Sequence, residues 1–155
     1  MSKKTVHTLD ELRLVAYEFL ANLAKEAPQE GAVLVGLTGD LGSGKTAFTK
    51  VVASVLGIDD TITSPTFVLE KRYSIPEGSI VNKRFSRLIH IDAYRLHKGE
   101  EMNALDWSAT LADRGNLILL EWPEQVTEVL PKKMFQLSFE YVDDGVRSVS
   151  GDFIE

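Results

Sequence analysis

The fold is decided by residues 32–46, which read Ala32-Val-Leu-Val-Gly-Leu-Thr38 and then Gly39-Asp-Leu-Gly-Ser-Gly-Lys-Thr46. The first part is a nearly continuous apolar run, typical of a strand buried on both faces of a parallel sheet. The second part matches Gly-x-x-x-x-Gly-Lys-Thr, the phosphate-binding loop. Apolar side chains then recur at helical spacing as far as Leu56, and Gly57 is suited to end a helix. Strand, glycine-rich loop and helix in this order predict a P-loop domain.

The residues of this loop suit phosphate binding for a physical reason. Glycines let backbone N–H groups curl around phosphate oxygens at the N-terminus of a helix. We expect Lys45 to reach the β and γ phosphates and the hydroxyl of Thr46 to face Mg²⁺. The residues expected to bind the nucleotide are Gly39, Asp40, Leu41, Gly42, Ser43, Gly44, Lys45 and Thr46.

The rest of the chain predicts the partners of this unit. Thr8-Leu-Asp-Glu11 has the form of a capping box, and apolar spacing predicts a helix from about Leu9 to Lys25. Strands are expected over 67–73, 87–92 and 117–121, one or two short helices over 96–114, and a hairpin over 135–153 turning at Asp144-Gly145. The predicted fold class is α/β, a P-loop NTPase fold with a mixed sheet, an antiparallel C-terminal hairpin and helices on both faces.

Size and composition narrow the function classes. The chain has 155 residues and a mass of 17.2 kDa, so we expect 1–155 to form a single P-loop ATPase domain. There is no Cys, which excludes disulfides, Cys-ligated zinc and thiol nucleophiles. A net charge of -6 disfavours a protein whose whole surface binds nucleic acid. With no secretory signal or membrane span in the sequence, the expected location is cytoplasmic.

Two carboxylates stand at the ends of buried strands. Asp92 ends Leu88-Ile-His-Ile-Asp92, and Glu121 ends Leu117-Ile-Leu-Leu-Glu121. A charge that emerges from buried aliphatic residues is costly unless it meets a metal or another partner. Beside a phosphate loop such groups are suited to hold Mg²⁺ and to orient water. The alternative is that each carboxylate simply faces solvent.

Four motifs occur in a fixed order: Gly39-Asp-Leu-Gly-Ser-Gly-Lys-Thr46, Ser64-Pro-Thr-Phe67, His90-Ile-Asp-Ala-Tyr-Arg95 and Glu121-Trp-Pro-Glu124. In this order, and in a chain of this length, the set resembles the bacterial TsaE family, formerly YjeE, from about Leu9 to Arg147. Its members are P-loop ATPases that assist the enzyme adding threonylcarbamoyl to the adenosine 3′ of the anticodon in tRNA. The resemblance implies a Mg²⁺-dependent ATPase that uses ATP as an accessory subunit, with threonylcarbamoyl-transferase subunits of the TsaD and TsaB type as partners.

The resemblance also implies roles for single residues. Thr66, in the family's switch-like loop, would lie near the γ-phosphate or the metal. Asp92 matches the acidic residue of the His-x-Asp-x-Tyr-Arg motif, and Glu121 matches the family's Glu-Trp. The candidate catalytic residues are therefore Glu121, Asp92 and Lys45, and the candidate metal ligands are Thr46, Glu121 and Asp92. The division of roles between Asp92 and Glu121 stays open.

Three nearby residues have two readings each. Trp122 would lie beside the nucleotide if the resemblance holds, or it simply packs. His90 shares a strand face with Asp92 and is more often a hydrogen-bonded sheet histidine than a functional group. Asp144-Gly145-Val-Arg147 corresponds to a hairpin that approaches the nucleotide in the family, but turn chemistry explains this stretch equally well, so Arg147 is left out of the predicted site.

Two rival functions are a small-metabolite kinase and a non-catalytic nucleotide-gated interaction module. The kinase would need an Arg-rich lid, and the only clustered candidates are Arg72, Arg84 and Arg87. A GTPase is disfavoured because no Asp-x-x-Gly occurs and Asn82-Lys-Arg-Phe85 lacks the Asp that reads guanine. The run from Lys83 to Lys98 holds five basic residues and one acidic residue, which suits a contact with tRNA, an acidic partner or solvent.

Overall fold

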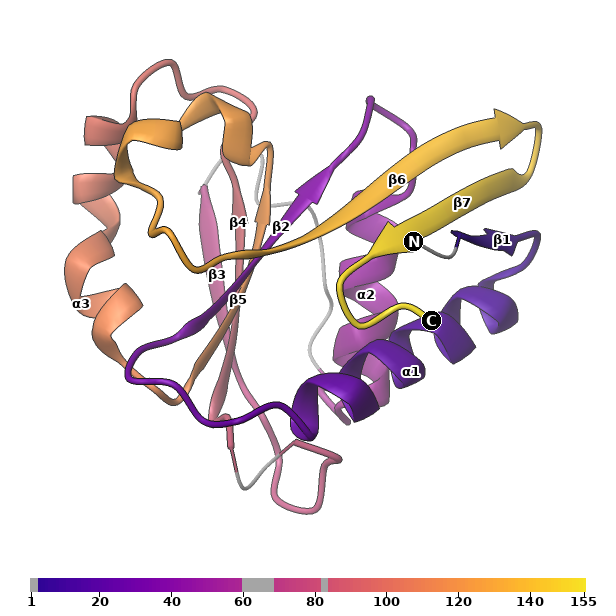
Figure 1. Cartoon of the computed structure of the whole chain (residues 1–155), viewed down its shortest axis with the longest axis horizontal. Coiled ribbons are helices and arrows are strands. Elements are labelled where there is room, and N and C mark those ends of the chain that lie inside the picture. Colours follow the sequence, from indigo (N-terminus) through magenta and orange to yellow (C-terminus); the bar gives the residue numbers. More distant parts are fainter. Residues whose placement is uncertain (1–2, 60–68, 82–83) are drawn as a thin grey trace.

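The computed structural model describes residues 3–59, 69–81 and 84–155, and these form a seven-stranded mixed sheet with helices on both faces (Figure 1). The strands are β1 (Lys3–Val6), β2 (Val33–Thr38), β3 (Glu70–Ser74), β4 (Arg87–Asp92), β5 (Asn116–Glu121), β6 (Phe135–Asp143) and β7 (Val146–Gly151). The α-helices are α1 (Leu9–Ala24), α2 (Lys45–Val55) and α3 (Trp107–Ala112), and the 3₁₀ helices are η1 (Gly99–Leu105), η2 (Pro123–Gln125) and η3 (Thr127–Val129).

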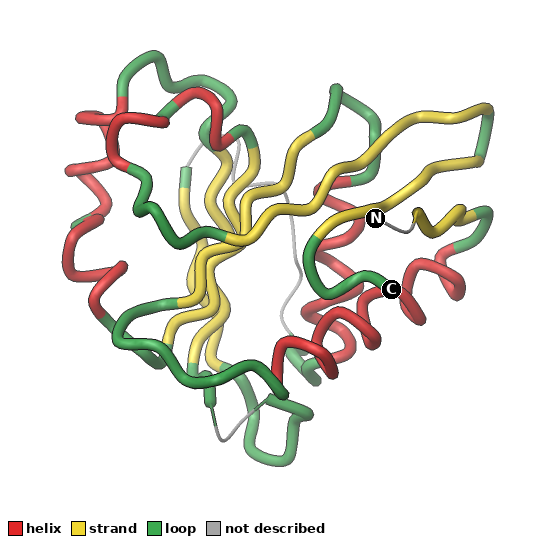
Figure 2. The backbone as a smooth tube through the Cα atoms, in the orientation of Figure 1, coloured by secondary structure: helices red, strands yellow, loops and turns green. Residues whose placement is uncertain are grey.

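The centre of the sheet is parallel and its edges are antiparallel. The strand order is β1-β7-β6-β2-β5-β4-β3, with β2 parallel to β5 and β6, and β4 parallel to β5. Leu37 pairs with Glu121, and Glu121 pairs with Asp92, so β2, β5 and β4 end at the same edge. The predicted mixed sheet and its C-terminal hairpin, β6–β7, are confirmed (Figure 2).

Each face of the sheet carries its own apolar core. Helices α1 and α2 pack on one face, where the rings of Phe19 and Phe48 meet edge to face with centroids 5.5 Å apart. The other face is covered by η1, α3 and the segment after β5, centred on the buried Met102 and Trp107. The expected helices on both faces are therefore present, and the loop between β2 and α2 emerges at the carboxyl edge of the sheet.

The first helix begins where the capping pattern predicts. The Thr8 hydroxyl accepts a hydrogen bond from the Glu11 N–H at 3.1 Å. The Glu11 carboxylate accepts from the N–H of His7 at 2.8 Å, one residue earlier than a regular capping box would have it. This contact fixes the turn between β1 and α1.

Two strands differ from the sequence expectation. The strand expected over 67–73 is observed as β3 from Glu70, and residues 67 and 68 lie outside the described residues. Strand β1 was not predicted, because Val6 is the only one of its four residues that is buried and the alternation is too short to recognise. Among the described helices, none has the length and apolar character needed to cross a membrane.

Candidate functional site

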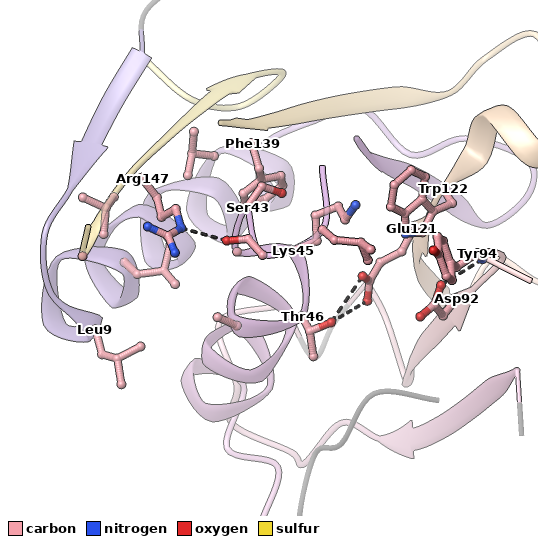
Figure 3. Close-up of a pocket in the computed structure, with 18 of the residues that line it drawn as sticks. Leu9, Ser43, Lys45, Thr46, Asp92, Tyr94, Glu121, Trp122, Phe139 and Arg147 are labelled. Carbon is pink, nitrogen blue, oxygen red and sulfur yellow. Dashed lines mark hydrogen bonds between the residues drawn. The ribbon is translucent and has the colours of Figure 1, made fainter. Parts of the chain in front are cut away.

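A cavity of about 710 Å³ opens at the carboxyl edge of the sheet, between the glycine-rich loop, the start of α1 and the β6–β7 hairpin (Figure 3). Its polar lining includes Lys45 and Thr46 on α2, Asp92 at the end of β4 and Glu121 at the end of β5. The parallel pairing of β2, β5 and β4 is what brings these segments together. Side chains that are far apart in the sequence therefore meet in one cavity, as expected at the carboxyl ends of parallel strands.

The loop before α2 has the geometry of an anion cradle. Gly39, Gly42 and Gly44 all have positive φ, at 145°, 79° and 111°. A Cβ at Gly39 would lie 2.4 Å from the carbonyl oxygen of Phe139, so this position also needs glycine for close packing. Among the described residues, no side chain caps the N-terminus of α2, which leaves its first amides available to a ligand. The buried Ser43 hydroxyl has no hydrogen-bond partner among the described residues and adds a further polar group to this cradle.

Lys45 lies inside the cavity wall with only 5% of its surface exposed. Its ammonium group donates to the carbonyl of Gly39 and lies 3.7 Å from the centroid of the Trp122 ring. Burial lowers the pKa of Lys45, and the negative charge of Glu121, which acts most strongly among the acidic groups that oppose this shift, partly restores it. The result is a largely buried cation in the cavity wall, close to the acidic groups that line the same cavity.

Glu121 is not a strand-end carboxylate in solvent, since only 3% of it is exposed. The Thr46 hydroxyl donates to its two oxygens at 3.1 and 3.3 Å, which joins the P-loop helix to β5 (Figure 3). On the other side, His90 Nε2 lies 2.5 Å from Glu121 Oε2. His90 is therefore a hydrogen-bonded sheet histidine, and its hydrogen-bond partner is the candidate catalytic carboxylate of Glu121.

Asp92 sits beside Glu121 in the parallel register of β4 and β5 and lines the same cavity. Its Oδ1 accepts a hydrogen bond from the N–H of Tyr94 at 3.0 Å, which fixes the carboxylate at the turn after β4. The ring of Tyr94 packs against Trp122, with centroids 5.1 Å apart. The two acidic strand ends therefore share one wall of the cavity with an aromatic pair.

Comparisons with known proteins identify the family of this chain. Residues 7–149 match the family model described as "Threonylcarbamoyl adenosine biosynthesis protein TsaE". The chain belongs to the TsaE family. It is 38% identical over 109 residues to the tRNA threonylcarbamoyladenosine biosynthesis protein TsaE of Streptomyces coelicolor, which covers 69% of this chain and 68% of the relative. The TsaE of Bacillus subtilis is 34% identical over 131 residues, covering 84% and 75%.

A solved structure shows the same fold. The crystal structure of Bacillus subtilis YdiB superimposes with a TM-score of 0.70 and 25% sequence identity, covering 97% of this chain and 83% of that one. The protein is therefore a TsaE-family member with a P-loop NTPase-like fold, and its family is that of tRNA threonylcarbamoyladenosine biosynthesis proteins.

Only part of the glycine-rich loop, residues 39–46, lines the cavity. Residues 41–46 face the cavity, whereas Gly39 and Asp40 are not among its lining residues. Gly39 instead receives the Lys45 ammonium on its carbonyl oxygen. Thr66, expected near the γ-phosphate or the metal, lies outside the described residues.

Arg147 is a cavity residue that the sequence prediction left out. Its Nε donates to the Gly42 carbonyl at 2.9 Å, and its guanidinium stacks 4.5 Å from the Tyr141 ring centroid. The β6–β7 hairpin thus brings a positive charge from the far end of the sequence onto the P-loop. The Asp144-Gly145 turn just before it predicts a hairpin but not where the hairpin docks, and the family resemblance was the signal that placed this hairpin near the nucleotide.

Trp122 follows β5 with φ 60° and ψ 50°, a left-handed conformation unusual for a non-glycine residue. Because Pro123 follows, the right-handed helical region is disfavoured at this position. The turn places the indole over the Lys45 ammonium, so Trp122 both packs and lines the cavity. The two readings drawn from the sequence are not exclusive.

The basic run from Lys83 to Lys98 does not form one patch in the part of the chain that is described. Strand β4 separates its two ends, and the side chains near its start are engaged elsewhere. Arg84 donates to the carbonyls of Glu26 and Ala27, and Arg87 forms an ion pair with Asp113. Arg84 and Arg87 are therefore anchored by contacts within the fold, and tRNA contact through this run stays a prediction.

Proposed function

We propose that this TsaE-family protein is a Mg²⁺-dependent ATPase that acts as an accessory subunit in threonylcarbamoylation of the adenosine 3′ of the anticodon in tRNA. The observation that carries the proposal is the hydrogen bond from Thr46 to Glu121, which sets a P-loop hydroxyl against a strand-end carboxylate beside Lys45. The comparisons support the pathway, and the cavity chemistry supports nucleotide hydrolysis. The proposed unit is the whole chain, 1–155, as one domain.

The donor set suits a magnesium ion. Mg²⁺ prefers oxygen ligands and is usually held by one or two protein groups together with substrate phosphates and water. Thr46 and Glu121 provide such oxygens in contact with each other, and Asp92 is the neighbouring carboxylate. Within residues 3–59, 69–81 and 84–155, no three His or acidic side chains could hold a metal by themselves, which fits a site completed by phosphates. When bound, the ion would neutralise charge on the β and γ phosphate oxygens.

The remaining steps are assigned to the chain's own groups. Lys45 would exchange its contacts with Gly39 and Trp122 for phosphate oxygens and balance the charge of the leaving group. Glu121 and Asp92 would orient the attacking water or its metal neighbour, a role that serves the transition state more than the bound ATP. The amides at the start of α2 would hold the phosphates in line for attack.

The other end of the cavity suits the nucleoside. Leu9, Leu12 and Val149 line it, and Figure 3 shows Leu9 on the side away from Glu121. An apolar wall suits the faces of a purine ring, with the polar phosphates directed toward Lys45. The proposed partners are the threonylcarbamoyl-transferase subunits of the TsaD and TsaB type. The proposed location is the cytoplasm, where tRNA is modified.

The positions of the three arginines considered for a lid do not favour the kinase alternative. Arg72 bonds to Glu70 and to the Thr110 hydroxyl. None of the three arginines considered for a lid, Arg72, Arg84 and Arg87, lines the cavity. Hydrolysis therefore fits the described residues better than transfer to a second metabolite.

The test is multiple-turnover tRNA modification with purified transferase subunits, following product phosphate and modified tRNA together. Repeated rounds should require this protein and ATP, and Glu121→Ala should stop them while a single round proceeds. Tighter docking to the transferase with a non-hydrolysable ATP analogue than without nucleotide should accompany this. Sustained modification without the protein, or full activity with Glu121→Ala, would refute the accessory ATPase and favour the kinase or the interaction module.

A further inference from the structure

His90 is buried in the middle of the sheet next to the candidate site. It is fully covered on β4, and its Nε2 lies 2.5 Å from Oε2 of Glu121 on the neighbouring strand. Both side chains point toward the α2 side of the sheet, the side on which Leu88 and Leu119 contribute to the core. On this side the Glu121 carboxylate therefore meets a buried ring rather than water.

The contacts on Glu121 come from opposite sides. Thr46 reaches the carboxylate from α2 and His90 reaches it from β4, so the group is held between a helix and a strand. A carboxylate with a single partner can rotate about its last bond, whereas one with two fixed partners cannot. The contacts with Thr46 and His90 together therefore fix the orientation of the Glu121 oxygens toward Thr46.

Apart from the contact with Glu121, the His90 ring forms no hydrogen bond with the described residues. His90 Nδ1 is buried and has no hydrogen-bond partner among the described residues. An aliphatic side chain beside Leu88 and Leu119 would avoid the cost of burying this nitrogen. The Nε2 contact with Glu121 is therefore the interaction that compensates for a polar ring in this core.

We infer that His90 is a positioning residue: it donates through Nε2–H to Glu121 and holds that carboxylate against Thr46 in the orientation that receives Mg²⁺. The inference rests on the proposed function, because it assigns His90 a role at the same metal site. Partners behind a metal ligand orient it, and their loss typically costs about tenfold to a hundredfold in metal affinity or activity.

Two amide substitutions test this role with almost the same chemistry. In His90→Gln the amide nitrogen lies the same number of bonds from Cα as His Nε2, so it can reach Glu121. In His90→Asn the nitrogen falls where Nδ1 was, one bond too short. His90→Leu removes the donor while filling the core. Thermal unfolding of all three variants reports any general loss of fold.

The readout is binding of a non-hydrolysable ATP analogue, titrated with Mg²⁺ and measured separately in EDTA. His90→Leu and His90→Asn should raise the Mg²⁺ concentration for half-maximal effect by about tenfold or more, and His90→Gln by much less. Binding in EDTA should be parental in all three. A similar Mg²⁺ response for Gln, Asn and Leu, whether parental or equally weakened, would overturn the positioning role. If the parent binds no analogue, or its binding ignores Mg²⁺, the proposed function itself fails.

Discussion

The ammonium nitrogen of Lys45 lies 3.7 Å from the centroid of the Trp122 ring and donates to the carbonyl of Gly39 at the start of its own loop. A cation over an indole face contributes roughly 0.5–2 kcal/mol, more as it is removed from water. Lys45 is therefore already satisfied before any phosphate arrives. Binding of ATP must compete with these contacts, which makes Lys45 the residue whose substitution and titration are most informative.

Replacement of this lysine should weaken nucleotide binding. Lys45→Ala removes charge-assisted contacts with phosphate worth roughly 1.5–3 kcal/mol, so ATP affinity should fall about tenfold or more. Calorimetric titration with MgATP measures this directly. Lys50→Ala is the matched control, since Lys50 is an exposed lysine on the same helix. Parental affinity in Lys45→Ala would show that Lys45 does not contact the phosphates.

The affinity for ATP should also depend on pH through Lys45. Burial, the largest cause, lowers its pKa, so the ammonium loses its proton at a lower pH than an ordinary lysine, whose pKa is about 10.4. Because phosphate favours the charged form, affinity should fall as pH rises through the lowered pKa. Titrations between neutral and alkaline pH measure the decline. Lys45→Arg stays charged over this range, and an identical decline in that variant would assign the effect to another group.

The two strand-end carboxylates should affect catalysis more than binding. Glu121→Ala should lower the rate of ATP hydrolysis by about a hundredfold while changing ATP affinity much less, and Asp92→Ala should act in the same direction. Phosphate release and calorimetry separate the two quantities. Glu140→Ala serves as the control, because Glu140 is an exposed carboxylate paired with Lys3. Parent-like turnover in both site variants would remove the catalytic assignment.

Arg147 should contribute to nucleotide binding although it comes from the C-terminal hairpin. It holds the loop through the Gly42 carbonyl and places its charge at the cavity. Arg147→Ala should weaken ATP binding by roughly tenfold, with Arg147→Lys in between because the charge remains but the fork is lost. Arg13→Ala, at an exposed arginine that bonds to Ser54 on α2, is the control. Equal affinities for Arg147→Ala and the parent would assign Arg147 to folding alone.

We expect the nucleotide site to prefer adenine over guanine. The sequence lacks the residues that recognise guanine in GTPases, and the apolar wall formed by Leu9 and Leu12 provides no described carboxylate for the guanine amino group. ATP with Mg²⁺ should therefore bind more tightly than GTP in parallel titrations. Equal or tighter GTP binding would contradict this expectation.

Some of the fold could be predicted from local chemistry. The strand before Gly39, the helix after Gly44 and the cap at Thr8 depend on spacing and on backbone preferences that act over a few residues. The same holds for Asp92 and Glu121, whose positions at the ends of aliphatic runs mark them as strand-end charges. Strand β1 escaped prediction because its pairing with β7 compensates for a weak pattern.

The amino-acid sequence by itself determined that this protein has a P-loop, two strand-end acids and a C-terminal hairpin, because each is written in a short stretch of the chain. Only the tertiary structure decided which groups touch. Parallel pairing of β4 with β5 set His90 against Glu121, and docking of the hairpin brought Arg147 to Gly42. Such contacts join residues far apart in the chain, and their geometry follows from strand order and register, which no local pattern encodes.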